Sequence, residues 1–161
     1  MKRTINFLAA ATLVLAAVPM FAATANAPLA VSATVAQNCT ITTSPVAFGA
    51  YDTVTGTAVS GTGAVNVACT MGSTGLTIDL NTGANGLAAV GTTRAMKSGA
   101  AYLNYDLYTE NTHTTLWATG VTIPDAPSKA SRPFTVYGLI AANQDVAAGA
   151  YSDTVTATLN Y

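Results

Sequence analysis

Residues 28–37 read Pro-Leu-Ala-Val-Ser-Ala-Thr-Val-Ala-Gln, and apolar side chains occupy alternate positions of this stretch: Leu29, Val31, Ala33 and Val35. Successive side chains of a β-strand point to opposite faces, so these four would share one face of an extended segment. The stretch contains no charged residue. Because an unpaired apolar strand is prone to aggregate, the sequence predicts that this segment pairs with a partner strand.

The residues before this stretch have the pattern of a secretory signal peptide. Lys2 and Arg3 give a positive start, small and apolar residues dominate positions 7–18, and residues 23–25 (Ala-Thr-Ala) fit an A-x-A cleavage site. A second site of this kind lies at residues 25–27, although a proline would follow that cut. The apolar run is shorter than the roughly 20 residues that a membrane-spanning helix needs.

The length and composition favour one exported domain. We expect residues 1–25 to be the signal peptide, residues 26–37 an N-terminal extension and residues 38–161 a single domain. Hydrophobic residues make up 50% of the chain and charged residues 8%, which is the opposite of the composition of disordered chains. Six Lys and Arg residues stand against seven acids and form no basic cluster, so nucleic acid is a poor partner. Stable insertion in a membrane is not expected either.

The chain contains two cysteines, Cys39 and Cys69. An even pair in an exported chain is typical of a disulfide. Cys39 shares its predicted strand face with Ile41, and Cys69 shares its face with Val67, so both thiols would point to the apolar side. A metal site is not expected, because the chain has a single histidine and no C-x-x-C motif.

Alternating apolar and polar residues recur after position 37, and Gly, Asn, Asp and Pro separate these runs. The clearest predicted strand is 101–109, with Leu103, Tyr105 and Leu107 on one face. Further strands are expected at 38–42, 65–69, 76–80, 94–97, 134–141 and 152–161, and shorter pieces at 46–48 and 116–117. Residues 56–63 read as a polar loop or a weak edge strand, and residues 85–92 as a loop. Many short strands with such punctuation favour an all-β sandwich.

Four blocks of residues carry a resemblance to a known family: 48–52 (Phe-Gly-Ala-Tyr-Asp), 67–70 (Val-Ala-Cys-Thr), 94–96 with 103–108, and 136–138 with 148–155. Their order and spacing resemble the spore coat protein U domain over residues 33–161. That family includes the pilins of archaic chaperone–usher pili. The resemblance implies an immunoglobulin-like β-sandwich that is incomplete and is completed by a donated N-terminal strand.

The same resemblance implies partners and positions. The partners would be a periplasmic chaperone, an outer-membrane usher and further copies of this chain, joined by β-augmentation. The inserted side chains would be those of Leu29, Val31, Ala33 and Val35. One wall of the groove, and a chaperone contact, would be the strand at 154–161, with Val155, Ala157, Leu159 and Tyr161. The protein would pass through the periplasm to the cell surface and support attachment and biofilm formation as a fimbrium or coat.

Three alternatives remain beside this interpretation. Residues 28–35 could be an ordinary first strand of their own sheet, and the chain could be a spore or cell coat component that forms no pilus. Tyr102, Tyr108 and Trp117 could instead form a sugar-stacking platform of a carbohydrate-binding module, although packing of large rings is the simpler explanation.

An enzyme is the least favoured class. His113 lies in a predicted loop tip without a placed nucleophile, so no catalytic triad is indicated. Asp106 and Asp153 lie near strands, and we interpret them as solvated acids rather than a catalytic pair. No catalytic residue, metal or cofactor is therefore predicted.

Overall fold

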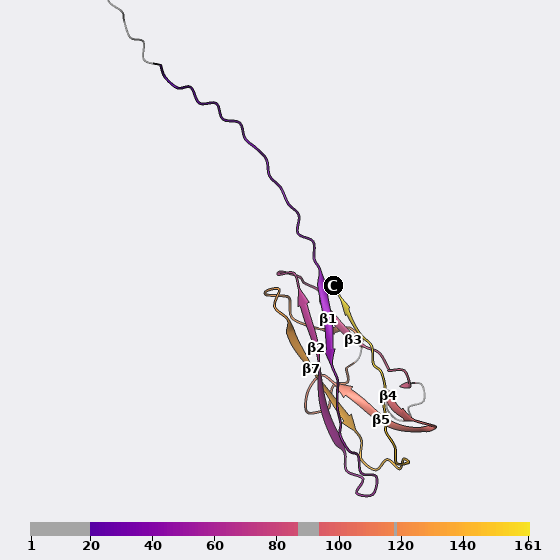
Figure 1. Ribbon diagram of the computed structural model, residues 1–161. Helices are drawn as coiled ribbons and strands as arrows, with labels where there is room; N and C mark the ends of the chain where they lie inside the picture. Colours follow the sequence, from indigo (N-terminus) through magenta and orange to yellow (C-terminus); the bar gives the residue numbers. More distant parts are fainter. Residues whose placement is uncertain (1–19, 87–93, 118) are drawn as a thin grey trace, which may run out of the picture. The chain divides into compact units, whose positions relative to one another are not determined.

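The computed structural model describes residues 20–86, 94–117 and 119–161 (Figure 1). The chain divides into two compact units, Met1–Thr34 and Val35–Tyr161. Residues 20–38 form no regular strand, so the structure does not have residues 28–35 as the first strand of their own sheet. The predicted signal peptide falls mostly on residues 1–19, and the predicted loop at 85–92 mostly on residues 87–92; both stretches lie outside the described residues.

The second unit is all-β. Eight strands are present in the described residues: β1 (Cys39–Ser44), β2 (Val59–Cys69), β3 (Thr77–Leu80), β4 (Arg94–Ser98), β5 (Ala101–Tyr108), β6 (Val121–Thr122), β7 (Arg132–Ile140) and β8 (Ala157–Asn160). They form a five-stranded sheet in the order β1-β2-β7-β5-β4 and a three-stranded sheet in the order β6-β3-β8. All pairs are antiparallel. The predicted all-β fold is confirmed, and the arrangement fits an immunoglobulin-like sandwich.

One hydrophobic core joins the two sheets. It contains alternate residues of β2, β5 and β7 from the larger sheet and of β3 from the smaller one. Val67 and Ile78 are completely buried, and Leu103, Tyr105 and Leu107 are buried on the predicted face of β5. The alternation found in the sequence therefore marks which side of each strand faces the other sheet.

Of the two alternatives predicted for residues 56–63, a polar loop or a weak edge strand, the strand is present from Val59 onward, but it is not an edge strand. Residues from Val59 onward belong to β2, which pairs with β7 from Val59↔Ile140 to Val67↔Arg132. A Cβ atom on Gly61 would lie 2.7 Å from the carbonyl oxygen of Ala47, and one on Gly63 would lie 2.7 Å from that of Ser44. These glycines mark a close backbone approach within a long strand, and not a loop.

The last strand is shorter than predicted. Only Ala157–Asn160 form a regular strand, β8, on the edge of the smaller sheet. The preceding residues are extended, but their partners change along the way. Ser152 exchanges both backbone hydrogen bonds with Lys97, whereas Thr154 and Thr156 accept bonds from the loop that follows β3. No continuous ladder forms because this segment crosses from one sheet to the other.

The short pieces expected at 46–48 and 116–117 are not regular strands. Residues 46–48 have no strand assignment, and Leu116 forms an isolated bridge with Tyr108. Val46 and Phe48 nevertheless alternate as predicted, since both are half-buried and pack against the core. The alternation thus predicted correctly which side chains face the core, although these residues do not form a paired strand.

Candidate functional site

A groove runs between two segments of the domain that have no strand partner on their inner sides. Its first hollow, of about 390 Å³, lies between residues 43–48 and residues 151–157, and Val65, Leu107 and Val136 are among its floor residues. A second hollow, of about 610 Å³, continues between residues 46–53 and residues 146–151. We call these together the groove, because both are lined by Val46, Phe48, Met96 and Tyr151.

The rims of the groove expose strand edges. β1 is the outermost strand of the larger sheet and β8 is an edge strand of the smaller one, and the two lie near each other without pairing. On the C-terminal rim, residues 151–157, the backbone groups of Ser152, Thr154 and Thr156 bond away from the groove. Within the described residues, no hydrogen bond uses the backbone groups of Asp153 or Val155. Unpaired backbone groups beside an apolar floor are what an added strand needs.

Asp153 anchors the C-terminal rim. Its Oδ1 accepts hydrogen bonds from the backbone N–H of Ala84 (2.9 Å) and the side-chain amide of Asn85 (3.0 Å), and its Oδ2 accepts one from the Tyr105 hydroxyl (2.7 Å). A Cβ atom on Gly83, at φ +82°, would lie 2.0 Å from that Oδ2. The prediction that Asp153 is a solvated acid was therefore wrong, because residues distant in sequence surround its carboxylate.

Burial and the hydrogen bond to Asp153 both raise the pKa of Tyr105, burial being the larger cause. The Tyr105 hydroxyl thus stays protonated and remains a donor to the Asp153 carboxylate. Tyr105 lines the groove together with Asp153, so this pair places a hydroxyl and a carboxylate beside the aliphatic floor residues.

A buried arginine lies beside this pair. Arg94 is 3% exposed, and its guanidinium donates to the carbonyls of Leu80 (2.9 Å), Asn81 (2.9 Å) and Trp117 (3.2 Å). Burial lowers the pKa of Arg94, and its attraction to the carboxylates of Asp106 and Asp153 opposes that change. Arg94 thereby holds the end of β3, from which the chain continues to the residues that bind Asp153.

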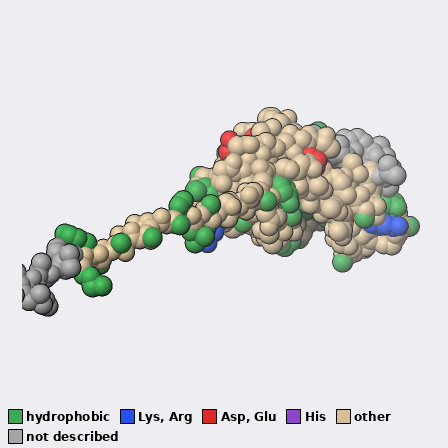
Figure 2. All heavy atoms as spheres, turned by 90° about the horizontal axis from the view of Figure 1, so that it is seen from above, with side chains coloured by type: hydrophobic (Ala, Val, Ile, Leu, Met, Phe, Trp, Pro, Cys, Tyr) green, Lys and Arg blue, Asp and Glu red, His purple; other side chains and the backbone are tan. Residues whose placement is uncertain are grey.

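The predicted wall residues take different positions. Val155 and Ala157 line the groove, whereas Leu159 packs against the core without lining it and Tyr161 is exposed. The four predicted donor side chains are all exposed, Leu29 and Val31 by 87% and Val35 by 81%. Figure 2 shows hydrophobic side chains along the extended N-terminal segment and few charged side chains on the visible face of the molecule.

The predicted disulfide is confirmed. Cys39 and Cys69 are bonded and lie directly opposite each other in the register of β1 and β2. Cys69 is buried and Cys39 half-buried, as their shared apolar parity indicated. The bond joins β1 to β2 at the end of the sandwich where the N-terminal segment leads into β1.

The aromatic residues do not form a common platform. Trp117 is 4% exposed, and its indole N–H donates to the carbonyl of Ile78 at 3.3 Å. The Lys97 ammonium lies over the ring of Tyr102, and Tyr108 packs edge-on against His113. A sugar could not stack on a buried Trp117, so the carbohydrate-binding alternative loses one of its three rings.

His113 lies in the turn that the sequence predicted, at φ +53°, but half-buried. The part of the chain that the structure describes contains no group of three or more His, Cys, Asp or Glu residues placed to hold a metal. Nor does any helix in that part have the length and apolar character to cross a membrane.

The cluster of Gly83, Arg94, Tyr105 and Asp153 was not predicted from the sequence. One signal was available, because Tyr105 occupies the apolar face of a strongly alternating strand. A buried tyrosine hydroxyl requires a hydrogen-bond partner, but the pattern could not tell which residue supplies it.

Comparison with known proteins agrees with this architecture. The family model of the Spore Coat Protein U domain matches residues 25–158. The chain belongs to the Spore Coat Protein U domain family. It is also 34% identical over 176 aligned residues to "Protein U" of Myxococcus xanthus, with 99% of this chain and 98% of that protein covered. The family is one of structural pilus and coat domains, which supports a structural role at a surface or in a coat.

Proposed function

We propose that this protein polymerises by donor-strand exchange, in which residues 28–35 of one subunit fill the groove of the next. The observation that carries the proposal is the groove itself, which lies between two rims with unpaired backbone edges. The same chain supplies an uncharged segment with apolar side chains on alternate positions. An added strand would pair with the rims through its backbone and direct these side chains to the floor.

The chemistry of the two surfaces is complementary. Val65, Leu107 and Val136 offer aliphatic contacts, and burying an exposed Val or Leu side chain contributes roughly 1.5–3 kcal/mol. The backbone groups of Asp153 and Val155 would gain partners from the inserted strand. Leu29, Val31 and Val35 would lose the solvent exposure that they have in the single chain.

Export and assembly partners follow from the same exchange. Residues 1–25 would direct the chain to the periplasm, where Cys39 and Cys69 can be oxidised. A periplasmic chaperone would occupy the groove until a second subunit replaces it, and an outer-membrane usher would receive the subunits. The polymer would then reach the cell surface and support attachment and biofilm formation.

The test compares two neighbouring positions of opposite parity. Val31→Asp would place a carboxylate against the apolar floor, which is strongly unfavourable without a partner. We expect the wild type to form a ladder of oligomers in unheated detergent gels, and this variant and a chain without residues 26–37 to form none. Ser32→Asp is the matched control, because Ser32 lies on the opposite face. Equal effects of both substitutions would contradict insertion by alternate side chains.

A coat without a pilus is the second candidate, favoured by the spore coat family to which the chain belongs. The same exchange would operate between subunits, but the product would be a layer and not a fibre. Electron microscopy of cells that produce the protein separates the two, since thin surface fibres support a pilus and a continuous layer supports a coat.

A further inference from the structure

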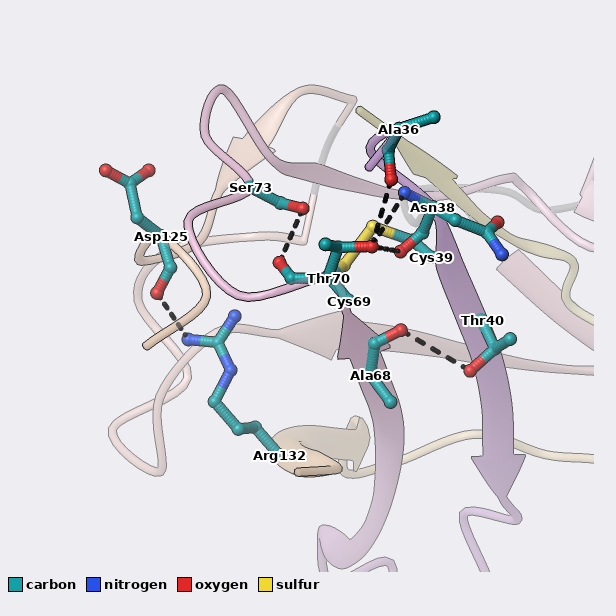
Figure 3. The surroundings of a disulfide bond; sticks show 10 residues. All are labelled: Ala36, Asn38, Cys39, Thr40, Ala68, Cys69, Thr70, Ser73, Asp125 and Arg132. Carbon is teal, nitrogen blue, oxygen red and sulfur yellow. Dashed lines mark hydrogen bonds between the residues drawn. A yellow bond between two sulfur atoms is a disulfide. The ribbon is translucent and has the colours of Figure 1, made fainter. Parts of the chain in front are cut away.

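Thr70, directly after β2, holds the residues that lead into β1 (Figure 3). The backbone N–H of Asn38 donates to Thr70 Oγ1 at 3.1 Å, and the backbone N–H of Thr70 donates to the carbonyl of Asn38 at 2.8 Å. The Thr70 hydroxyl also lies within hydrogen-bond distance of the carbonyls of Asn38 (3.2 Å) and Ala36 (3.4 Å), and donates its hydrogen to one or the other. One side chain thus connects to two residues of the segment 36–38.

The disulfide strengthens the same place covalently. Cys39↔Cys69 is the first register pair between β1 and β2, and Thr70 follows immediately in the sequence. β1 therefore cannot separate from β2 at this end while the disulfide is intact. The bonds of Thr70 extend this fixed region outward from Cys39 as far as Ala36.

Thr70 is itself fixed by hydrogen bonds within the turn that follows it, residues 70–73. Ser73 is 2% exposed and donates to the Thr70 carbonyl through both its hydroxyl (2.7 Å) and its backbone N–H (3.1 Å). Ala126 exchanges backbone bonds with Gly72 and Ser73, and the guanidinium of Arg132 donates to the Asp125 carbonyl at 3.1 Å. Since Arg132 is the first residue of β7, the turn is connected to the central part of the larger sheet.

We propose that Thr70 and the disulfide make the joint between successive subunits of the polymer stiff. This inference rests on the proposed function, because a joint exists only where Val35 is seated in a neighbouring groove. Three residues, Ala36, Gln37 and Asn38, would then separate the inserted strand from β1. With Asn38 bonded to Thr70 and the Ala36 carbonyl within hydrogen-bond distance of the Thr70 hydroxyl, the spacer has little rotational freedom, in contrast to a flexible linker of the same length.

The test uses polymers of the full chain with three substitutions. Thr70→Val keeps the shape and removes the hydroxyl, Thr70→Ser keeps the hydroxyl, and Thr40→Val removes the hydroxyl of a nearby β1 threonine whose partner is the Ala68 carbonyl. Two quantities are measured: the persistence length of the polymers in electron micrographs and the exchange rate of the Asn38 amide hydrogen. The ladder of oligomers in unheated detergent gels shows whether each variant still polymerises.

We expect Thr70→Val to form a normal ladder but more flexible polymers, with exchange of the Asn38 amide hydrogen roughly fivefold faster for the loss of one hydrogen bond. Thr70→Ser and Thr40→Val should both keep the persistence length and the exchange rate of the wild type. Polymers of Thr70→Val as stiff as the wild type would overturn the inference, and so would loss of its ladder while the subunit stays folded. Absence of a ladder from the wild-type chain would instead refute the proposed function.

Discussion

A single carboxylate organises the turn that follows β5. Glu110 Oε1 accepts hydrogen bonds from the backbone N–H groups of Thr114 (3.1 Å) and Thr115 (2.5 Å) and from the Thr114 hydroxyl (2.8 Å), and Oε2 accepts one from the Thr109 hydroxyl (2.5 Å). These bonds, with that of Thr109 as the largest contribution, lower the pKa of Glu110 to about 2. The charged form is therefore bound more favourably in the folded turn than in the unfolded chain.

The lowered pKa gives a prediction with a definite sign. Because the folded pKa lies below the ordinary value of 4.5, the stabilisation by Glu110 is complete above pH 4.5 and is lost as the pH falls toward 2. Carboxyl-carbon NMR can follow this directly, since Glu110 is the only glutamate in the sequence. We expect a midpoint near 2 and faster amide exchange at Thr114 and Thr115 below it. Glu110→Gln should give fast exchange at all pH values, and a midpoint near 4.5 would contradict the hydrogen-bonded turn.

Individual residues were predicted well where their environment is local. The alternation in β5 identified the buried faces of Leu103 and Leu107. The even pair of cysteines predicted the disulfide, and their parity predicted that it faces the apolar side. The role of Asp153 was not predictable in this way, because its partners come from the loop after β3 and from β5. Hydrogen bonds between residues so far apart leave no periodic signal in a single sequence.

At the scale of elements, the C-terminal rim depends on Asp153 because it lacks a continuous ladder. Asp153→Ala would leave the Tyr105 hydroxyl without its acceptor, and the Ala84 N–H would keep only the Thr154 carbonyl. Losing a hydrogen bond to a charged group costs roughly 1.5–3 kcal/mol, and the part-buried position favours the lower end of that range. We expect the free energy of unfolding of the full chain, measured in urea, to fall by that amount.

Asp145→Ala is the matched control, since Asp145 is an exposed acid of the same long connection between β7 and β8. It should leave the free energy of unfolding nearly unchanged. Amide exchange at Ser152 should also become faster in Asp153→Ala alone. An equal loss of stability in both variants would show that Asp153 does not anchor the rim.

Strand prediction failed where the chain packs against itself closely. Gly61 and Gly63 suggested a polar loop or a weak edge strand, but they lie within β2, an interior strand, and allow residues 44–48 to approach it. The last strand was overestimated because apolar alternation continues through residues 152–160 while their hydrogen-bond partners change. The alternation reports which side is buried, and only the folded chain shows which backbone groups are paired.

At the scale of the whole molecule, the disulfide is the main covalent constraint on the sandwich. It joins residues 30 positions apart, and closing such a loop stabilises by about 3–4 kcal/mol in the chain-entropy model. We expect the double change Cys39→Ala and Cys69→Ala to lower the free energy of unfolding by this amount. Urea titrations of the oxidised wild type and the variant give the value, and the wild type under reducing conditions should match the variant. A difference well below 1 kcal/mol would show that the bond contributes little.

The groove and the N-terminal segment belong to the same chain, and this has a consequence for any polymer they build. Each subunit would offer one receptor, the groove, and one plug, the N-terminal segment, and the two are different surfaces, so their contact is heterologous. A heterologous contact gives an open polymer wherever the rotation between subunits does not close into a ring. Such a polymer has a direction. One end would carry an empty groove, the vacant receptor, and the other an N-terminal segment that is not inserted, the unused plug. A capping molecule that fits one end therefore could not block the other.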